Sequence, residues 1–429
     1  MKSYSVLRPL GLCLLALMIA KPLHGQLLLF GAKEKGKKYG FINERGDYVI
    51  APTFDEVGFF YKGAAVVKQG KKFGIINEQG QFTVQPIYDG ATLYAPEAKF
   101  TVKKGTKWGV VNSSGEEIIP FQYDYLSVMK DGYIVGGSLI PGKQFKNRVC
   151  PIVLNDKNEV VFETGQNDPE GHDCTQLFLP GFAYPTTGNY SPGFPMVRDG
   201  MLIVLEAWEG GPNYAQYKVM DVKTGSGIVL QQEMAIADDY LGMREGTLAI
   251  DLAIEEENQD DENQIYGRVK IIPENANRKG VFYDTANIKA QNFDVPLFNN
   301  DNLTVANQFQ RAHPFFNGVA AVQIDNKWAF VDREGWIISE TKLATSEYKA
   351  FPPMYFNGLI GLFKNGKAGY VDINGKEIIP FTLDEYHPFE YAVTPVKKGG
   401  LYGLLRKDGS WAVAPKFEKL SLSPCPCYQ

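Results

Sequence analysis

Short apolar runs alternate with polar turns along much of the chain, and the first clear example lies between residues 38 and 56. Residues 39–43 read YGFIN, an aromatic and β-branched run that is typical of a strand. The turn NERG follows, and its Asn and Gly suit a hairpin loop whose last residue has a positive φ. The next run, DYVI at 47–50, predicts the second strand of a β-hairpin.

A proline follows this predicted hairpin, at Pro52. Because proline has no N–H to donate to a neighbouring strand, we expect the second strand to end near it. An aromatic residue and an acid come next in TFDE, and the small-apolar run GAAVV at 63–67 predicts one more strand. Three to four strands then fit into the 34 residues between Gly40 and Gly74, which leaves little room for loops.

The same unit recurs along the chain. Six segments align on the glycine that follows the aromatic residue: KKYGFINERG, KKFGIINEQG, TKWGVVNSSG, NKWAFVDREG, GKAGYVDING and GLYGLLRKDG. The aligned positions that we expect to be structural are Tyr39, Gly40, Phe73, Gly74, Trp108, Gly109, Trp328, Gly369, Tyr402 and Gly403. In the fourth segment Ala329 replaces the glycine. One unit cannot bury its apolar face alone, so we expect the copies to stack on one another.

The region between the third and fourth copies still shows a faint strand–turn–strand pattern, at 150–163, 217–231 and 278–291. If these segments are divergent copies, the chain has about nine units. The prediction is therefore an all-β fold of tandem short β-meander repeats. Because closed propellers usually have roughly four to eight blades, we retain both a β-propeller-like ring and an open β-solenoid.

The chain divides into four parts. Residues 1–25 are predicted to be a signal peptide, because Lys2 and Arg8 precede an apolar core at 10–20 and KPLHG gives a polar exit. The remaining parts are N-terminal repeats at 26–130, divergent repeats with long insertions at 131–310, and C-terminal repeats with a short tail at 311–429. The apolar core is too short for a membrane span of about 20 residues. We therefore expect an extracytoplasmic protein without a membrane span, located in the periplasm, at the cell surface or outside the cell.

The charge balance argues against two classes of partner. Loss of residues 1–25 removes three basic residues and no acid, which shifts the formal net charge from −5 to −8. A clearly acidic protein is a poor partner for nucleic acid and for an anionic membrane surface. We expect neither of them to be the partner.

Four cysteines follow the predicted signal peptide. Cys150 and Cys174 are the local candidates for a disulfide in an oxidising compartment. Cys425 and Cys427 lie in the sequence CPC near the C-terminus, with no histidine nearby. Two thiolates alone make a weak metal site, so we interpret this tail as structural or disordered. We expect no metal and no cofactor.

The long insertions of the middle region are the candidate recognition segments. Residues 179–200 are rich in Pro, Gly and aromatic residues, and large rigid rings are frequent in recognition loops. We assign the contact region to Phe182, Tyr184, Tyr190, Phe194 and Trp208. The alternative is a loop held by its own proline and aromatic contacts.

Two other segments of the middle region carry chemistry-bearing residues. The run EEENQDDENQ at 255–264 lacks the spacing of a calcium loop, so a solvated charged loop is the preferred interpretation. The run EGHDC at 170–174 places His, Asp and Cys side by side. Catalytic groups converge in space rather than in sequence, so a disulfide loop is preferred here.

The sequence offers no catalytic set. It has no GxSxG, P-loop or dinucleotide-binding motif, and His172, His313 and His387 are far apart. Carboxylates recur near the proline of several units, at Asp55, Asp89, Asp124 and Asp384. A glycosidase needs two carboxylates about 5–10 Å apart. Because these acids are copied with the repeat, we favour turn capping through backbone N–H groups.

The string KWG at 107–109, with the turn, strand, Pro120 and Tyr123–Asp124 that follow, resembles the bacterial WG-repeat (KWG-repeat) family. Good matches lie within 36–130 and 311–420. The resemblance implies a surface or secreted repeat protein of the predicted fold. It supplies no catalytic residues, since members mostly lack a defined activity.

Three functions follow from these observations. The preferred one is an exported, non-enzymatic repeat protein that acts as a binding module or surface scaffold for an unknown protein or glycan. The alternative is a secreted, glycosidase-like hydrolase with a carboxylate site in the middle region. The third is a purely structural spacer.

Overall fold

The structure is a computed structural model that describes residues 28–93, 95–128, 132–139, 148–155, 157–163, 175–176, 196–207, 215–229, 234–236, 243–244, 247–253, 278–284, 309–344 and 353–421. Within these ranges the chain forms antiparallel strands, and the one helical element is a single 3₁₀ turn, η1 (Pro96–Ala98). No helix in the described part is long and apolar enough to cross a membrane. The predicted all-β class is confirmed.

The described strands form nine antiparallel sheets, which we number in chain order. Sheet 1 consists of β36 (Lys419–Leu420), β1 (Phe30–Lys33), β2 (Tyr39–Ile42) and β3 (Tyr48–Phe54). Sheet 2 consists of β4 (Glu56–Val57), β5 (Ala64–Gln69), β6 (Lys72–Asn77) and β7 (Phe82–Tyr88). Sheet 3 consists of β8 (Gly90–Ala91), β9 (Phe100–Lys104), β10 (Lys107–Val111) and β11 (Glu117–Tyr123).

The middle region supplies three sheets. Sheet 4 consists of β12 (Tyr125–Val128), β13 (Ile134–Leu139), β14 (Arg148–Leu154) and β15 (Val160–Glu163), with β16 (Thr175–Gln176) also on β14. Sheet 5 consists of β17 (Met196–Arg198), β18 (Met201–Ala207), β19 (Ala215–Asp221) and β20 (Gly227–Val229). In sheet 6, the strand β23 (Thr247–Ala253) pairs with β21 (Met234–Ile236), β22 (Met243–Arg244) and β24 (Arg278–Asp284).

The C-terminal part supplies the last three sheets. Sheet 7 consists of β25 (Arg311–Ala312), β26 (Ala320–Ile324), β27 (Lys327–Val331) and β28 (Ile337–Ala344). Sheet 8 consists of β29 (Tyr355–Phe356), β30 (Leu359–Lys364), β31 (Lys367–Val371) and β32 (Glu377–Leu383). Sheet 9 consists of β33 (Val393–Lys398), β34 (Leu401–Arg406) and β35 (Trp411–Phe417).

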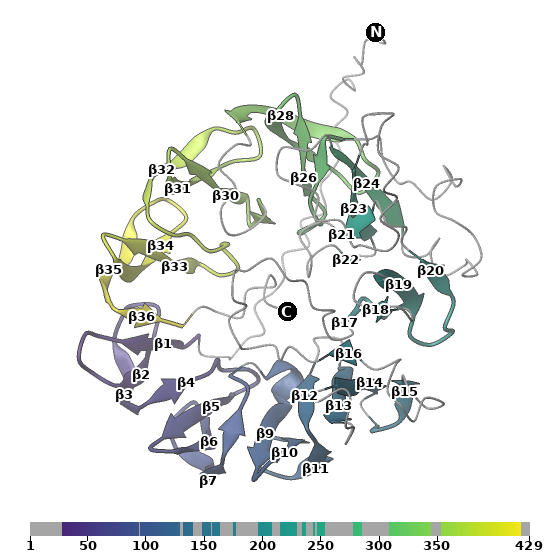
Figure 1. Ribbon diagram of the computed structural model, residues 1–429. Coiled ribbons are helices and arrows are strands. Elements are labelled where there is room, and N and C mark those ends of the chain that lie inside the picture. Colours follow the sequence, from purple (N-terminus) through teal and green to yellow (C-terminus); the bar gives the residue numbers. More distant parts are fainter. Residues whose placement is uncertain are drawn as a thin grey trace.

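The sheets follow one another around a ring, with their last strands toward the rim (Figure 1). The ends of the chain join through β36, which pairs with β1 in the register Ala32↔Leu420 and Lys33↔Lys419. This connection has the same form as the connections between other neighbouring sheets, in which the chain leaves the last strand of one sheet and enters the first strand of the next. After β35 the Glu418 N–H donates to the Lys33 carbonyl at 2.8 Å, as the Asp55 N–H after β3 donates to the Lys68 carbonyl at 2.9 Å. The fold is therefore the propeller-like ring of the two predicted alternatives.

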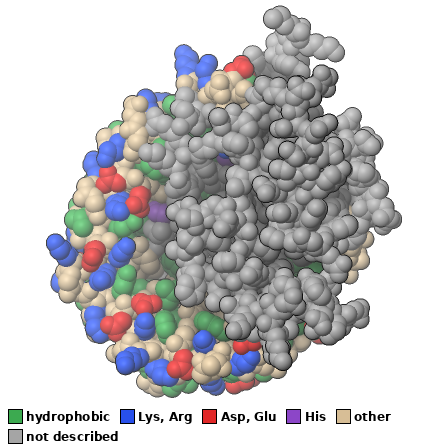
Figure 2. Space-filling model, viewed as in Figure 1, with side chains coloured by type: hydrophobic (Ala, Val, Ile, Leu, Met, Phe, Trp, Pro, Cys, Tyr) green, Lys and Arg blue, Asp and Glu red, His purple; other side chains and the backbone are tan. Residues whose placement is uncertain are grey.

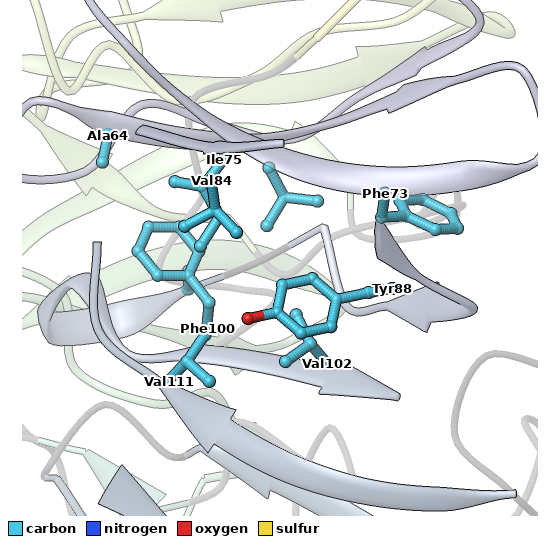
Figure 3. Packing of buried hydrophobic residues seen from close by; sticks show 10 residues of the cluster. Ala64, Phe73, Ile75, Val84, Tyr88, Phe100, Val102 and Val111 are labelled. Atoms are coloured by element: carbon cyan, nitrogen blue, oxygen red, sulfur yellow. The ribbon is translucent and has the colours of Figure 1, made fainter. Parts of the chain in front are cut away.

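The hydrophobic core lies between neighbouring sheets. In one cluster Phe73, Ile75 and Tyr88 of sheet 2 pack against Phe100 and Val102 of sheet 3 (Figure 3). Equivalent clusters join sheet 1 to sheet 2, 3 to 4, 4 to 5, 7 to 8, 8 to 9 and 9 to 1. In these seven pairs of sheets, each sheet obtains its dry surface from its neighbour, as predicted for stacked repeats.

The predicted hairpin of the repeat is confirmed, and in sheet 1 it joins the last two strands, β2 and β3. The Asn43 side-chain oxygen accepts hydrogen bonds from the N–H groups of Arg45 and Asp47, at 2.9 and 3.1 Å. Gly46 closes the turn with φ of 85°, a conformation that only glycine adopts without strain. The same side-chain contacts recur at Asn77, Asn112, Asn155 and Asp372, and in the turn at Asn155 the residue with positive φ is Asn158.

The second strand of the predicted hairpin, which is the fourth strand of its sheet, ends close to its proline as expected, but the expectation that the proline stops the pairing is wrong. β3 continues through Pro52 to Phe54, and β7 likewise continues through Pro86 to Tyr88. The proline lies at a bulge, because Tyr39 pairs with Phe54 while Phe41 pairs with Ile50. Proline is tolerated at bulges and on edge strands, and the fourth strand is both bulged and at the edge of its sheet.

Candidate functional site

Successive turns of a sheet lie alternately on the two faces of the ring, because its strands are antiparallel. In sheet 2 the turns at 61–64 and 77–80 share one face, and the turn at 69–72 lies on the other. We call the turns that join the first two strands of a sheet the inner turns, since those strands lie toward the ring centre (Figure 1). The inner turns with the same backbone form are 61–64, 316–319 and 356–359. They lie on one face of the ring, toward its centre, and are the candidate site.

The inner turns are tight two-residue hairpins. Both central residues have a positive φ: 47° and 82° at Lys62–Gly63, 52° and 76° at Asn317–Gly318, and 50° and 90° at Asn357–Gly358. Such turns favour Asn followed by Gly. Lys62 therefore occupies a conformation that two other sheets give to asparagine, which indicates that its side chain has a role of its own.

Each of these turns reaches the next sheet through its first central residue. The Asn317 side-chain amide donates to the Tyr355 carbonyl of sheet 8 at 2.9 Å. The Asn357 amide donates to the Phe389 carbonyl at the start of sheet 9, at 2.6 Å. The Lys62 ammonium instead binds the side-chain carboxylate of Glu97, which precedes β9 of sheet 3.

Glu97, which lies before β9 of sheet 3, binds the inner turn of sheet 2 through an ion pair and a hydrogen bond. Its other carboxylate oxygen accepts a hydrogen bond from the Tyr61 hydroxyl, with an O–O distance of 3.0 Å. The hydrogen bond from Lys62 lowers the pKa of Glu97 most, and that from Tyr61 adds to this effect. Partial burial raises the pKa, but the net shift is downward. Burial and the Glu97 carboxylate raise the pKa of Tyr61. At neutral pH the cluster therefore presents a carboxylate and a neutral phenol, and the carboxylate is paired with Lys62.

Sheet 1 contributes the two ends of the described chain to this face. The Gly31 N–H donates to the Ser421 hydroxyl and the Ser421 N–H donates to the Gly31 carbonyl, both at 2.5 Å. Leu28 and Ser421 are the first and last described residues. On the neighbouring sheet 9, Tyr391 is 41% exposed and close enough to Tyr61 to raise its pKa. The face therefore offers two tyrosines close to the junction of β1 with β36.

The chemistry of this face suits recognition of polar groups. Phenol, carboxylate, ammonium and amide groups donate and accept hydrogen bonds, and aromatic rings add apolar contact at low entropic cost. The described rim in Figure 2 carries basic and acidic side chains interspersed with one another. Within the described residues, no group of three or more His, Cys, Asp or Glu side chains is arranged to hold a metal ion.

The recurring carboxylates lie on the opposite face and hold the framework together. The Asp55 carboxylate accepts the Gly70 N–H at 2.7 Å and pairs with Lys38 at 3.0 Å. Asp89 contacts Gly105 and Lys72 in the same way, and Asp384 contacts Gly400 and Lys367. The lysine contacts and then the backbone N–H groups lower the pKa values of all three carboxyls. The predicted turn capping is confirmed for Asp55, Asp89 and Asp384, and the capped turn lies in the next sheet of the ring.

The aromatic residue of the repeat has a lysine over its ring. Lys33 lies 5.7 Å from the Tyr39 ring centre and Lys68 lies 5.2 Å from that of Phe73. The equivalent pairs are Lys103 with Trp108 and Lys397 with Tyr402. Trp328 of sheet 7 is buried and lies 5.2 Å from the His313 ring, which takes the place of the lysine contact. The predicted aromatic positions are thus part of the structural framework.

The predicted glycines allow close approach of two backbones. A Cβ atom on Gly40 would lie 2.5 Å from the Ile50 carbonyl oxygen, and one on Gly74 would lie 2.6 Å from that of Val84. Gly109, Gly369 and Gly403 are confined by the equivalent carbonyl oxygens at 2.8, 2.8 and 2.5 Å. These positions are structural, as their recurrence indicates.

The predicted recognition residues lie outside the described part of the chain. They are Phe182, Tyr184, Tyr190, Phe194 and Trp208, together with Cys174, Cys425 and Cys427. Cys150 lies in β14, where its backbone pairs with Ser138 of β13. The contact region and the disulfide stay predictions.

The inner turns as a group were not predicted from the sequence. The signal was present in three dipeptides, Lys62–Gly63, Asn317–Gly318 and Asn357–Gly358, each directly before a small-apolar strand. Alignment of the units on these dipeptides would have identified the turns. The contacts of Glu97 with Tyr61 and Lys62 join residues about 35 positions apart, and no local pattern indicates them.

Several solved structures are similar in overall course. A eukaryotic initiation factor is 12% identical, with 92% of this chain and 97% of that chain covered and a TM-score of 0.39. Apo AztD from Citrobacter koseri is 9% identical, with 92% and 97% covered and a TM-score of 0.33. Hsv2p from Kluyveromyces lactis is 9% identical, with 73% and 92% covered and a TM-score of 0.31. Likenesses this weak say nothing about what the chain does.

No curated protein matches the chain in sequence. The family described as "WG containing repeat" matches it at residues 39–73, 73–108, 108–135, 300–328 and 369–402. The first three segments begin at the aromatic residues Tyr39, Phe73 and Trp108, so the matched unit has the period of the sheets. The resemblance stated from the sequence is confirmed: the chain carries repeats of the WG-containing family.

Proposed function

We propose that the protein is an exported, non-enzymatic binding module or surface scaffold whose partner is a protein or a glycan. The observation that carries this proposal is the use of the repeated carboxylates. Asp55, Asp89 and Asp384 each accept a backbone N–H and pair with a lysine of the framework. Carboxylates committed in this way maintain the ring rather than carry out hydrolysis.

The distribution of variation supports the same function. The framework of turn, lysine and carboxylate recurs from sheet to sheet, whereas the inner turns carry Lys62 and Tyr61 in one sheet and asparagines in two others. The sequence carries long insertions between residues 131 and 310, which are further candidates for variable loops. A constant frame with variable loops is the arrangement that binding proteins of repeat architecture use.

The binding proposal is tested with the processed full-length protein as bait against its native cell envelope and against a glycan array. One variant replaces Phe182, Tyr184, Tyr190, Phe194 and Trp208 by alanine. A matched control replaces the exposed framework residues Val49, Ile87 and Ile378 by alanine. We expect a specific partner that the wild type and the control retain and the five-residue variant loses. Equal capture by all three proteins would reject the assigned contact region.

Export and the absence of catalysis have their own tests. N-terminal sequencing of the protein from fractionated cells is expected to begin near Gln26, in an extracytoplasmic fraction. Full-length protein in the cytoplasm would contradict export. Release of reducing sugar from envelope polysaccharides by the purified protein would support the hydrolase alternative and reject the non-enzymatic function.

A further inference from the structure

One position near the centre of the ring can be compared in five of the described sheets. It lies five residues before the residue that pairs with the repeat glycine, or with Ala329 in sheet 7. In sheets 2, 7 and 8 it is the first central residue of the inner turn. The residues at this position, which we call the tip position, are Lys62, Glu97, Asn317, Asn357 and Tyr391.

Asparagine suits the tip position, and the other residues there do not. Asn317 and Asn357 each precede a glycine, have a positive φ and donate to a carbonyl of the next sheet. In sheet 3 the two residues at this place are Glu97 and Ala98, with φ of 59° and 54°. Residues of these types are strained in this conformation, and such strain is retained at functional sites. The turn alone therefore does not explain Lys62 and Glu97.

The residue before the tip position changes together with it. In sheets 7 and 8 this residue is phenylalanine, and the buried rings of Phe316 and Phe356 lie 5.7 Å apart between their centres. In sheet 2 it is Tyr61, whose hydroxyl binds Glu97. Sheet 2 thus departs from sheets 7 and 8 at two consecutive residues, and both new side chains bind the same carboxylate.

The charged groups of this cluster remain accessible to a ligand. The side chain of Lys62 is 56% exposed and that of Glu97 is 39% exposed. A carboxylate can accept about four hydrogen bonds and an ammonium can donate about three, so both groups retain capacity. The segment that leads to Glu97 is held against sheet 2, because the Phe59 N–H donates to the Leu93 carbonyl at 3.3 Å. The cluster is therefore pre-organised for binding.

Tyr391 adds an exposed aromatic ring to the same site. It belongs to sheet 9, and sheets 9 and 2 lie on either side of sheet 1 (Figure 1). Tyr391 is 41% exposed and lies close to Tyr61. A tyrosine ring offers an apolar face together with a polar hydroxyl, which suits the C–H and O–H groups of a sugar.

The charge balance of the cluster indicates the class of ligand. The carboxylate and the ammonium cancel, so the cluster does not favour a strongly charged ligand. Sugar hydroxyls both donate and accept hydrogen bonds, and the cluster places an acceptor directly beside two donors. An uncharged sugar therefore matches the site better than an acidic or a basic molecule does.

We propose that Tyr61, Lys62, Glu97 and Tyr391 form a binding site for an uncharged glycan. A sugar ring packs against Tyr391, and its hydroxyl groups bind Glu97 and Lys62. This assignment rests on the proposed binding function and names the chemical class of the partner. It also adds a contact region on the described face of the ring to the one predicted in the insertion at 179–200.

The first test uses the processed full-length protein on an array of neutral and acidic oligosaccharides, followed by calorimetric titration of the best neutral binder. Tyr391→Ala is expected to weaken its affinity about 10-fold or more, because the ring surface is lost. Glu97→Gln is expected to weaken it about 10-fold, because hydrogen bonds to an ionised group are the stronger ones. The control Leu401→Ala removes an apolar side chain, 38% exposed, from the opposite face of sheet 9. It is expected to leave the affinity unchanged.

The second test separates binding from structure through Lys62→Asn. Asparagine before glycine is the favoured sequence of this turn, so the melting temperature is expected to stay the same or rise. Loss of the ammonium is expected to weaken glycan binding about 10-fold. The matched control Lys71→Asn makes the same exchange in the turn on the opposite face of sheet 2. It is expected to bind as the wild type does.

The outcomes distinguish this proposal from the binding function on which it rests. Preference for acidic oligosaccharides, or wild-type affinity in both Lys62→Asn and Tyr391→Ala, would overturn the proposal. Glycan binding that only the five-residue variant of the middle region loses would reject this site and keep the binding function. Capture of an envelope protein without any glycan would do the same. A wild type that binds neither a protein nor a glycan would reject both.

Discussion

Sheets 2 and 7 solve the same packing problem in two ways. In sheet 2, Phe73 pairs with Tyr88 and Ile75 pairs with Val84, so Gly74 faces a bulge that contains Pro86. In sheet 7 the bulge is displaced by one position, because Lys327 pairs with Ala344 and Ala329 pairs directly with Glu340. Sheet 7 has neither the glycine nor the proline.

The difference shows that the glycine, the bulge and the proline depend on one another. The bulge brings the neighbouring backbone to a place where a Cβ atom would clash, so glycine is required opposite it. The bulged strand can accept proline, because the residues at the bulge do not pair in the ladder. When the bulge moves, as in sheet 7, alanine is accommodated and the edge strand loses its proline.

Exchange of the two residues tests this comparison most strongly. In Gly74→Ala the new Cβ atom would lie 2.6 Å from the Val84 carbonyl oxygen and 3.0 Å from the Pro86 nitrogen. We expect a loss of roughly 3 kcal/mol in unfolding free energy, since backbone atoms must move. The reverse change, Ala329→Gly, is expected to cost only about 1 kcal/mol in strand entropy. Urea denaturation measures both, and equal losses would contradict the account.

A histidine–proline–phenylalanine segment shared by sheets 7 and 9 offers a pH-dependent test. Burial lowers the pKa of His387 to about 4, and the nearby Glu385 carboxylate opposes this only in part. The unfolded chain therefore binds a proton at a higher pH than the folded chain does. Stability is fully present above pH 6.5 and falls as the pH drops toward 4, by about 2–3 kcal/mol.

His387→Phe is expected to remove most of this pH dependence in urea unfolding between pH 7 and 4. The equivalent change in sheet 7, His313→Phe, serves as the matched variant, because it introduces the same ring into a buried position of the same segment. An undiminished slope in His387→Phe would show that His387 is not the group responsible.

The connection between neighbouring sheets offers a further test, for which we expect a smaller effect on stability. Asp384 binds Gly400 and Lys367, and the lysine followed by the backbone N–H lowers its pKa. At the entry to sheet 7, the neutral Gln310 accepts the Asn326 N–H at 2.9 Å instead. Asp384→Asn keeps an acceptor but loses the charge, so we expect a decrease of about one or two degrees in Tm at neutral pH.

The acid dependence of this variant is a further check. The depressed pKa of Asp384 stabilises the folded state above the ordinary carboxyl pKa, and this contribution disappears as the pH falls through the folded value. The Tm difference between wild type and Asp384→Asn should therefore shrink as the pH falls below the ordinary carboxyl pKa, and vanish once the folded protein binds the proton as well. A difference that is constant with pH would show that the lysine contact does not stabilise the fold.

The junction of the chain ends gives the smallest effect. In ordinary passages an acid faces a lysine, as Glu56 faces Lys68 at 2.5 Å and Glu385 faces Lys397 at 2.7 Å. At the junction Lys419 pairs with Lys33 instead. Lys419→Glu is expected to raise the unfolding free energy by roughly 0.5 kcal/mol at low salt, with the gain reduced by added salt. The control Lys419→Gln removes the repulsion between the two lysines without forming a new ion pair, so it measures the first effect alone.

The regular part of the fold could be predicted from the sequence because its determinants are local. The strand, the Asn–Gly hairpin and the recurring glycine at Gly40 and Gly74 all lie within a few residues of one another. The course of the strand beyond Pro52 could not be predicted, because a bulge depends on the pairing register with another strand. The partner of Asp55 is likewise set by the adjacent sheet, where Gly70 presents its N–H.

The candidate site was less accessible to sequence reasoning. The inner turns were recognised by their contacts with the next sheet, such as that of Asn357 with the Phe389 carbonyl. The spacing of residues within one unit does not reveal these contacts. Glu97 stands out only when the sheets are compared at the same structural position. The aromatic insertion at 179–200 was selected by composition, and its assignment awaits the binding experiment.

The central claim is that the sheets form one ring whose ends join through β1 and β36. A cysteine pair at Ala32 and Leu420 tests it most directly, because these residues are directly opposed in the two strands. We predict rapid disulfide formation under mild oxidation in the folded protein, detected in peptides by mass spectrometry, and much slower formation for the off-register pair at Ala32 and Ser421. Equal cross-linking of both pairs, or none in a folded protein, would contradict the joined ring.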